Sequence, residues 1–293
     1  MVHNRIRLLY LGLIALAIGI PSVQAQMNIE IKGVGQSLYP VAVSRFKDEN
    51  KLPVSITDVV RQNLARSGYF KNTELGNGIE DDQVMPNFKI WGSRGADALA
   101  VGSVTEKLPG QYEIRYRLYD IRKGESLNGL IVSASADNLR LAAHRISDDI
   151  IFKLLGEKGV FSTRLSYVIK EGKRFRLVIS DADGQNIRNA LNSSEPIISA
   201  AWSPDGQKIA YVSFEDRKPI VYVHELASGR RIVLSNAKGN NSAPSWAPDG
   251  KSLAISLSKD GNTQIYRVNA DGSNLQRLTQ GSTIDTEPQF SPD

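Results

Sequence analysis

The sequence contains no cysteine among its 293 residues. This absence excludes disulfide bridges, thiolate metal sites and cysteine nucleophiles, so the fold must depend on its hydrophobic core. The excess of positive over negative charge is also small: 36 basic and 31 acidic residues give a formal net charge of only +5. The basic residues form no run. Scattered charge of this kind argues against a nucleic-acid partner. The motifs Gly-x-Ser-x-Gly and His-Glu-x-x-His and the Walker loop are missing, so no catalytic constellation is expected.

Long apolar runs are absent too, with one short exception at the start of the chain. Residues 8–20 form a mainly apolar run of 13 residues that follows a basic lead with Arg5 and Arg7 and ends shortly before Ala25. This pattern is typical of a secretory signal peptide over residues 1–25. A membrane anchor is the alternative, but a span needs about 20 apolar residues. We therefore expect an exported, periplasmic protein without a membrane span.

Residues 38–160 show the mixed periodicity of an α+β domain. Apolar residues at helical spacing predict one helix after the cap Ser55 and a second helix after the cap Asp137, with Gly156 ending the second. Strands are predicted at 41–43, 98–102, 112–119 and 130–134. The last two should form a hairpin, and both helices should cover one face of the sheet. The preceding segment, residues 26–37, fits either a short exposed strand or a flexible tail.

The motif Trp-Ser-Pro-Asp-Gly organises the rest of the chain. It stands at 202–206, recurs as Trp-Ala-Pro-Asp-Gly at 246–250 and begins again at Phe290. The period is 44 residues in both intervals (246 − 202 and 290 − 246). A repeat in the forties that holds four short strands and tight turns is typical of a β-propeller blade. We therefore predict an all-β propeller over residues 161–293, with the tryptophans packed between blades.

The first blade is predicted to lack its inner strand, because no copy of the motif precedes Arg164. Strands are predicted at 164–170 and 174–180 in this blade, at 197–201, 208–214, 220–226 and 231–234 in the second, and at 243–247, 252–257, 264–268 and 275–278 in the third. A propeller ring can close by borrowing an inner strand from the far end of the chain. We therefore expect the sequence to be a C-terminally truncated fragment of about two and a half blades.

Candidate metal ligands in the sequence are better explained as structural residues. The segment 181–186 lacks the spacing and the glutamate of a calcium loop, and 269–272 occupies the equivalent place in a later repeat, so both are predicted to be turns. The acidic group at residues 80–82 is predicted to be a solvated loop. His144 is predicted to be a packing or surface residue of the second helix. No metal or cofactor is expected.

Three polar loops that contain proline precede the predicted inner strands. They are residues 194–196, 240–244 and 286–288, and they would surround one mouth of the propeller channel. Loops at one end of a rigid scaffold commonly carry function, which makes them candidates for docking another protein. The alternative is that they only shape the turns.

The combination of a signal peptide, a small α+β domain and these blades resembles the TolB family, the periplasmic propeller proteins of the Tol–Pal cell-envelope system. The resemblance runs along essentially the whole chain. It includes ALAVG at 98–102, YRLYD at 116–120, AHRISDDI at 143–150 and KIAYV at 208–212. It implies a six-bladed propeller in the family and a protein that is not an enzyme.

The resemblance also implies partners and the residues that contact them. The outer-membrane lipoprotein Pal would dock at one channel mouth, TolA would bind the N-terminal segment, and other Tol-system or outer-membrane proteins stay open as partners. The residues that correspond to the Pal contact are Asn240, Asn241, Thr286 and Glu287. Those that correspond to the TolA contact are Gln26, Met27, Asn28, Ile29, Glu30 and Ile31. Asn240 stands where some members carry histidine.

The function implied is that of an adaptor between the inner-membrane Tol complex and Pal, which maintains envelope integrity and constriction at cell division. The alternative is the gating propeller of a prolyl-oligopeptidase-like serine hydrolase, with its catalytic domain outside this sequence. A third hypothesis, a carbohydrate-binding propeller, predicts aromatic residues in the three rim loops, and these loops contain none.

Overall fold

A five-stranded mixed sheet forms the first part of the fold. The computed structural model describes residues 38–73 and 80–292, so the predicted signal peptide and the segment 26–37 lie outside the described residues. The strands are β1 (Tyr39–Val43), β2 (Phe70–Asn72), β3 (Ala98–Leu108), β4 (Gln111–Asp120) and β5 (Glu125–Ser135). Their order is β2-β1-β3-β4-β5, with β1 parallel to both of its neighbours and the other pairs antiparallel. The predicted hairpin is the pair β4–β5.

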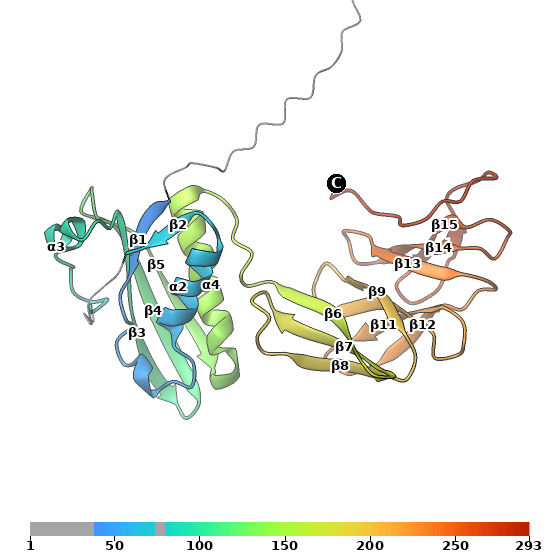
Figure 1. The fold of residues 1–293 in the computed structure, drawn as a ribbon, viewed down its shortest axis with the longest axis horizontal. Helices are drawn as coiled ribbons and strands as arrows, with labels where there is room; N and C mark the ends of the chain where they lie inside the picture. Colours follow the sequence, from blue (N-terminus) through green and yellow to red (C-terminus); the bar gives the residue numbers. More distant parts are fainter. Residues whose placement is uncertain (1–37, 74–79, 293) are drawn as a thin grey trace, which may run out of the picture. The chain divides into compact units, whose positions relative to one another are not determined.

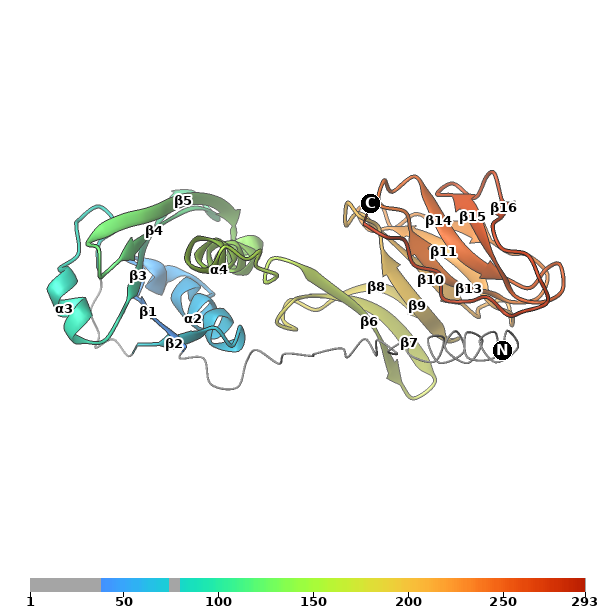
Figure 2. The same ribbon diagram turned by 90° about the horizontal axis from the view of Figure 1, so that it is seen from above.

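Two helices, α2 (Ile56–Arg66) and α4 (Leu139–Leu155), cover one face of this sheet (Figures 1 and 2). Their apolar sides and the sheet share one buried core. Its largest fully buried side chains are Phe46, Ile56, Leu64, Ile114, Tyr116, Leu118, Leu139 and Ile146. This arrangement confirms the predicted α+β layer.

Two short elements of this layer were not predicted. The helix α3 (Phe88–Ser93) packs Trp91 into a second cluster with Leu99 and Tyr119, and β2 extends the sheet beyond β1. Elements of six and three residues are too short to display a hydrophobic period. Their positions follow from tertiary contacts.

One of the two predicted N-cap residues is confirmed and the other is wrong. Ser55 accepts a hydrogen bond from the backbone N–H of Asp58 (3.1 Å), which confirms it as the N-cap of α2. Asp137 was predicted to cap the second helix, and that prediction is wrong: it lies in a 3-10 turn, Ala136–Asn138, and α4 starts after Asn138. The turn forms because the chain leaves β5 directly, with the N–H of Ala136 bonded to the carbonyl of Gly110 (3.0 Å). Gly156, at φ 75°, ends α4 as expected.

Three antiparallel sheets follow, each built as a propeller blade. The first contains β6 (Arg164–Glu171), β7 (Arg174–Asp181) and β8 (Arg188–Ser193). The second contains β9 (Ile197–Trp202), β10 (Lys208–Ser213), β11 (Ile220–Glu225) and β12 (Arg231–Ser235). The third contains β13 (Asn241–Trp246), β14 (Ser252–Leu257), β15 (Gln264–Asn269) and β16 (Gln276–Arg277). The partial propeller predicted from the 44-residue repeat is therefore confirmed.

The first blade has no inner strand among the residues that the structure describes, since β6 is the edge of its three-stranded sheet. The tryptophans of the two complete blades differ in their hydrogen bonding. Trp246 donates its Nε1 hydrogen to the carbonyl of Ala201 in the inner strand of the second blade (3.2 Å). Trp202 occupies the equivalent place one repeat earlier, and its buried Nε1 has no hydrogen-bond partner in the described part of the chain.

A recurring kink shapes the start of each inner strand. Ser199, Ala243 and Glu287 all have positive φ values, of 53°, 50° and 53°, and they are spaced 44 residues apart (243 − 199 and 287 − 243). The strand pairing of β9 and β13 shifts register at this point, which is the signature of a β-bulge. Since L-residues rarely adopt positive φ, the repeat imposes this conformation on three different side chains.

Candidate functional site

The predicted rim lies beside the start of the inner strands. A hydrogen bond from Ser245 Oγ to Gln289 Oε1 (3.5 Å) places the segment that contains Thr286 and Glu287 beside β13. Thr286 and Glu287 are exposed, and the Glu287 carboxylate makes no hydrogen bond or ion pair with any residue that the structure describes. Glu287 is thus an available charge on a backbone with the same positive φ as Ser199 and Ala243.

The two asparagines of the rim have different environments. Asn240 is exposed, and its backbone N–H is fixed by Ser258 Oγ (2.8 Å). Asn241 is fully buried: its side-chain oxygen accepts from Ser235 Oγ (2.8 Å) and the N–H of Ala237 (2.9 Å). Its amide donates to two backbone carbonyls of the same loop. Asn241 begins strand β13 and holds the loop, so the predicted loop 240–244 is a strand from residue 241 onward.

A buried polar network that the sequence did not reveal joins α2 and α4 to the turn after β7. Asp183 has a fully buried side chain in that turn. Its Oδ2 accepts hydrogen bonds from Arg140 Nε (2.7 Å) and Arg140 Nη2, and Arg66 Nη2 lies 3.8 Å away. Burial by itself would raise the pKa of Asp183, but the hydrogen bonds from Arg140 and from the N–H of Gln185 hold the pKa below its usual 3.8.

His144 is the second member of this network. It lies one helical turn after Arg140, so both side chains point to the same side of α4. Its ring is fully buried, Asn63 Nδ2 donates to Nδ1 (2.9 Å), and Nε2 lies 3.5 Å from Asp183 Oδ2. The prediction that His144 packs in the fold is therefore correct, whereas its polar partners lie too far along the sequence to be predicted. In the sequence, only the i, i+4 spacing of Arg140 and His144 indicated that these two side chains share one side of a helix.

His144, Asp181 and Asp183 are close enough to suggest a metal centre, since their ligand atoms lie within 4.8 Å of one another. The charges argue for another role. Two guanidinium groups, those of Arg140 and Arg66, already face the Asp183 oxygen that a metal would need. A cation there would meet two positive charges and would have to displace the Arg140 hydrogen bonds. The cluster is better described as an ion-pair network, and the Asp-Gly segment forms the predicted turn, with Gly184 at φ 78°.

Acidification tests this network through His144. Burial lowers the pKa of His144 below its usual 6.5, against the opposing effect of Asp183. A histidine with a lower pKa in the folded chain binds fewer protons there than in the unfolded chain. Its contribution to stability is therefore complete above pH 6.5 and is lost as the pH falls below that value. We expect the free energy of unfolding, measured in urea, to fall between about pH 7 and about pH 5.5, by at most about 1.4 kcal/mol per pH unit for this group.

The variant His144→Gln should reduce this pH slope. His224 provides the matched control, because burial, followed by the charge of Arg231, also lowers its pKa, and it lies in β11 away from Asp183. His224→Gln should remove its own share of the slope and leave the His144 share. An unchanged slope in His144→Gln would contradict the assignment.

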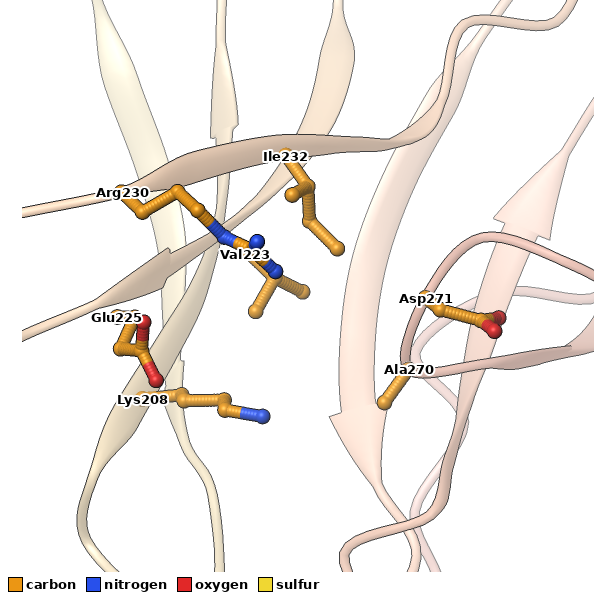
Figure 3. Close-up of a pocket in the computed structure, with 7 residues that line it drawn as sticks. All are labelled: Lys208, Val223, Glu225, Arg230, Ile232, Ala270 and Asp271. Atoms are coloured by element: carbon orange, nitrogen blue, oxygen red, sulfur yellow. The ribbon is translucent and has the colours of Figure 1, made fainter. Parts of the chain in front are cut away.

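The second and third blades also form a small pocket of about 180 Å³ (Figure 3). Val223, Ile232 and Ala270 give it apolar walls. Its charged residues are Lys208, Glu225, Arg230 and Asp271. Both carboxylates already accept hydrogen bonds from serine hydroxyls, those of Ser228 and Ser273 respectively. The pocket holds no histidine and no arrangement of acid, base and nucleophile.

Two family models account for most of the chain. The model described as the TolB amino-terminal domain matches residues 27–127, and the model of the TolB beta propeller domain matches residues 152–293. A solved structure, TolB from Acinetobacter baumannii, is 33% identical with a TM-score of 0.79, over 90% of this chain and 66% of that chain. The chain belongs to the TolB family. It thus spans just under two thirds of the length of that TolB structure.

Other solved structures are less similar to this TolB-family chain. A putative TolB from Agrobacterium tumefaciens is 20% identical over 62% of each chain, with a TM-score of 0.40. A puromycin-hydrolyzing peptidase from Mycobacterium tuberculosis is 15% identical over 62% of this chain and 30% of that chain, with a TM-score of 0.34. Likenesses at this level carry no argument about function. No helix within the described residues of the TolB-family chain has the length and apolar character to cross a membrane.

Proposed function

We propose that this TolB-family protein is a non-enzymatic periplasmic adaptor of the Tol–Pal system. It links the inner-membrane Tol complex to the outer-membrane lipoprotein Pal and thereby supports envelope integrity and constriction at cell division. Family membership over both domains supports this role. The signal-peptide pattern of residues 1–25 supports the periplasmic location.

The observation that supports the Pal assignment is the exposure of the Glu287 side chain. An exposed carboxylate without a partner among the described residues, on a backbone with positive φ, is available to a cationic or hydrogen-bond-donating partner. In this proposal Asn240, Thr286 and Glu287 contact Pal directly. Asn241 contributes by holding the neighbouring loop through its four buried hydrogen bonds.

The TolA contact is proposed for Gln26, Met27, Asn28, Ile29, Glu30 and Ile31. Their alternation of polar and apolar residues suits strand addition to a partner sheet, a common mode of peptide recognition. These residues lie outside the described part of the chain, so only the sequence pattern supports this contact.

Charge reversal at the rim tests the Pal contact. We expect Glu287→Lys in the full-length protein to weaken Pal binding by about tenfold or more, because it replaces an attractive contact with a repulsive one. The dissociation constant is measured with purified Pal by calorimetry. Asp249→Lys reverses another exposed carboxylate, in the turn between β13 and β14 at the end of the third blade opposite Asn240, and should leave binding unchanged. Equal affinity of the Glu287→Lys variant and the parent protein would refute the rim assignment.

A further inference from the structure

Strand β5 presents one long free edge of the first sheet. It comes last in the order β2-β1-β3-β4-β5, and no strand among the described residues pairs with its outer side. Figure 2 shows β5 at this margin, with α4 beside it. In an antiparallel edge strand, every second residue directs its backbone N–H and C=O away from the sheet. The outer side of β5 is therefore a row of backbone groups that another strand could use.

This edge lacks the features that usually prevent pairing. β5 is 11 residues long, and between Ser126 and Ser135 it contains no proline and no charged residue. Its pairing with β4 is regular from Gly129 to Ser135, since the register shift lies near the other end of the strand. Soluble proteins normally protect an exposed edge with lysine, proline, a bulge or a short strand. Between Gly129 and Ser135 all four protective features are absent, which favours pairing with another strand.

A groove lies on each face of the sheet along this edge. The groove on the helix side has a volume of about 210 Å³. Its apolar lining residues are Val132, Ala134, Leu141 and Ala142, and its only charged residue is Arg145. The groove on the other face has a volume of about 260 Å³ and is lined by Gly129, Leu130 and Ile131 of β5 with Arg115, Arg117 and Asp82.

The charges of the two grooves favour an acidic occupant. The side chains of Arg145 and Arg117 form no hydrogen bond or ion pair with any other residue that the structure describes, whereas the side chain of Arg115 is bonded to Glu113 (2.9 Å). Asp82 is the one carboxylate among the groove residues. Each groove therefore has a net positive charge, which favours carboxylates on an incoming strand.

We propose that the outer edge of β5 binds an extended segment of a partner protein in which apolar and acidic residues alternate. Side chains of an added strand point alternately to the two faces of the sheet, so one register sends all apolar side chains to one face and all carboxylates to the other. The apolar side chains enter the groove between β5 and α4. The carboxylates face Arg115 and Arg117. This docking surface is distinct from the rim.

A short peptide of alternating valine and glutamate, labelled with fluorescein, tests the proposal on the full chain. We expect saturable binding by fluorescence anisotropy, together with slower amide hydrogen exchange in residues 129–135. The matched peptide with lysine in place of glutamate should bind about tenfold more weakly or worse. Absence of binding, equal binding of both peptides, or protection located elsewhere would overturn the proposal.

Two variants make the test specific to this edge. Ile131→Glu places a negative charge at a side chain that is 59% exposed on β5, and it should weaken binding of the glutamate peptide by about tenfold. Leu108→Glu, at a side chain 66% exposed at the end of β3, is the control and should bind as the parent protein does. Arg117→Glu should weaken binding without any change in β5 itself. If β5 amides become protected with rising protein concentration and no peptide, the edge pairs with a second copy and the acidic-segment proposal is wrong.

Discussion

Replacing Trp246 with alanine is expected to lower the free energy of unfolding by about 3–5 kcal/mol, the largest effect of any single change considered. The indole is only 8% exposed and joins a cluster drawn from the second and third blades, with Val212 and Leu234 on one side and Leu253 and Ile255 on the other. The substitution would leave a cavity in the buried cluster that connects the two sheets. Urea unfolding followed by far-UV circular dichroism measures the effect.

Two control variants separate packing from hydrogen bonding at this site. Trp246→Phe keeps an aromatic ring but loses the bond from Nε1 to the Ala201 carbonyl, so a smaller loss of about 1–2 kcal/mol is expected. Trp202→Ala should cost less than Trp246→Ala, because Trp202 is half-buried and its Nε1 is already unsatisfied by the described residues. If Trp246→Ala unfolds at the same urea concentration as the parent protein, the tryptophan does not hold the blades together.

The variant Asp183→Asn should lower the free energy of unfolding by about 3 kcal/mol, because it removes one partner of a buried ion pair. The remaining charges, Arg140 and Arg66, would then face a neutral amide in a site where the Asp183 side chain is fully buried. The Asp-Gly turn itself should survive, since asparagine can still accept the N–H of Gln185 (3.0 Å). Urea unfolding at pH 7 measures the loss.

The third blade provides a matched control for this variant. Asp271 is two repeats after Asp183 (271 − 183 = 88) and accepts the N–H of Ser273 (2.9 Å) in the same kind of turn. Its side chain is exposed and has no arginine partner in the described residues. Asp271→Asn should therefore change stability by less than about 0.5 kcal/mol. Equal losses in both variants would show that the turn, and not the ion pair, accounts for the effect.

Most strands of the blades could be predicted from the sequence because the same pattern of short strands and turns recurs in each repeat. The strand at 252–257 was predicted with its exact bounds, and the other predicted strands differ from the structure by one or two residues, whereas β8 was not predicted. The positive φ at Ser199, Ala243 and Glu287 could not be predicted, since the three residues are chemically different. At Ser199 and Ala243 it accompanies a register shift in the pairing with the adjacent strand, which no single side chain encodes.

The candidate rim was also predictable only in part. The repeat predicted residues 240–244 and 286–288 as loops at the entry to inner strands, but β13 begins at Asn241, so only Asn240 of the first loop precedes the strand. Which of those side chains are exposed was not predictable. Asn240 and Asn241 are adjacent and chemically identical, yet one is exposed and the other is fully buried with four hydrogen bonds. The difference arises because Asn240 precedes β13, whereas the side chain of Asn241, the first residue of the strand, meets the Ser235–Ala237 segment.

The sequence alone determined the class of this protein, since a 44-residue period and the motif Trp-Ser-Pro-Asp-Gly leave a β-propeller as the architecture that accounts for both. It also determined where most strands, helices and turns lie, because these depend on local periodicity and turn chemistry. Only the tertiary structure decided which polar residues meet: Asp183 with Arg140, 43 positions apart, and Asn63 with His144, 81 positions apart. Such pairs depend on how distant elements pack, and local sequence carries no information about that distance.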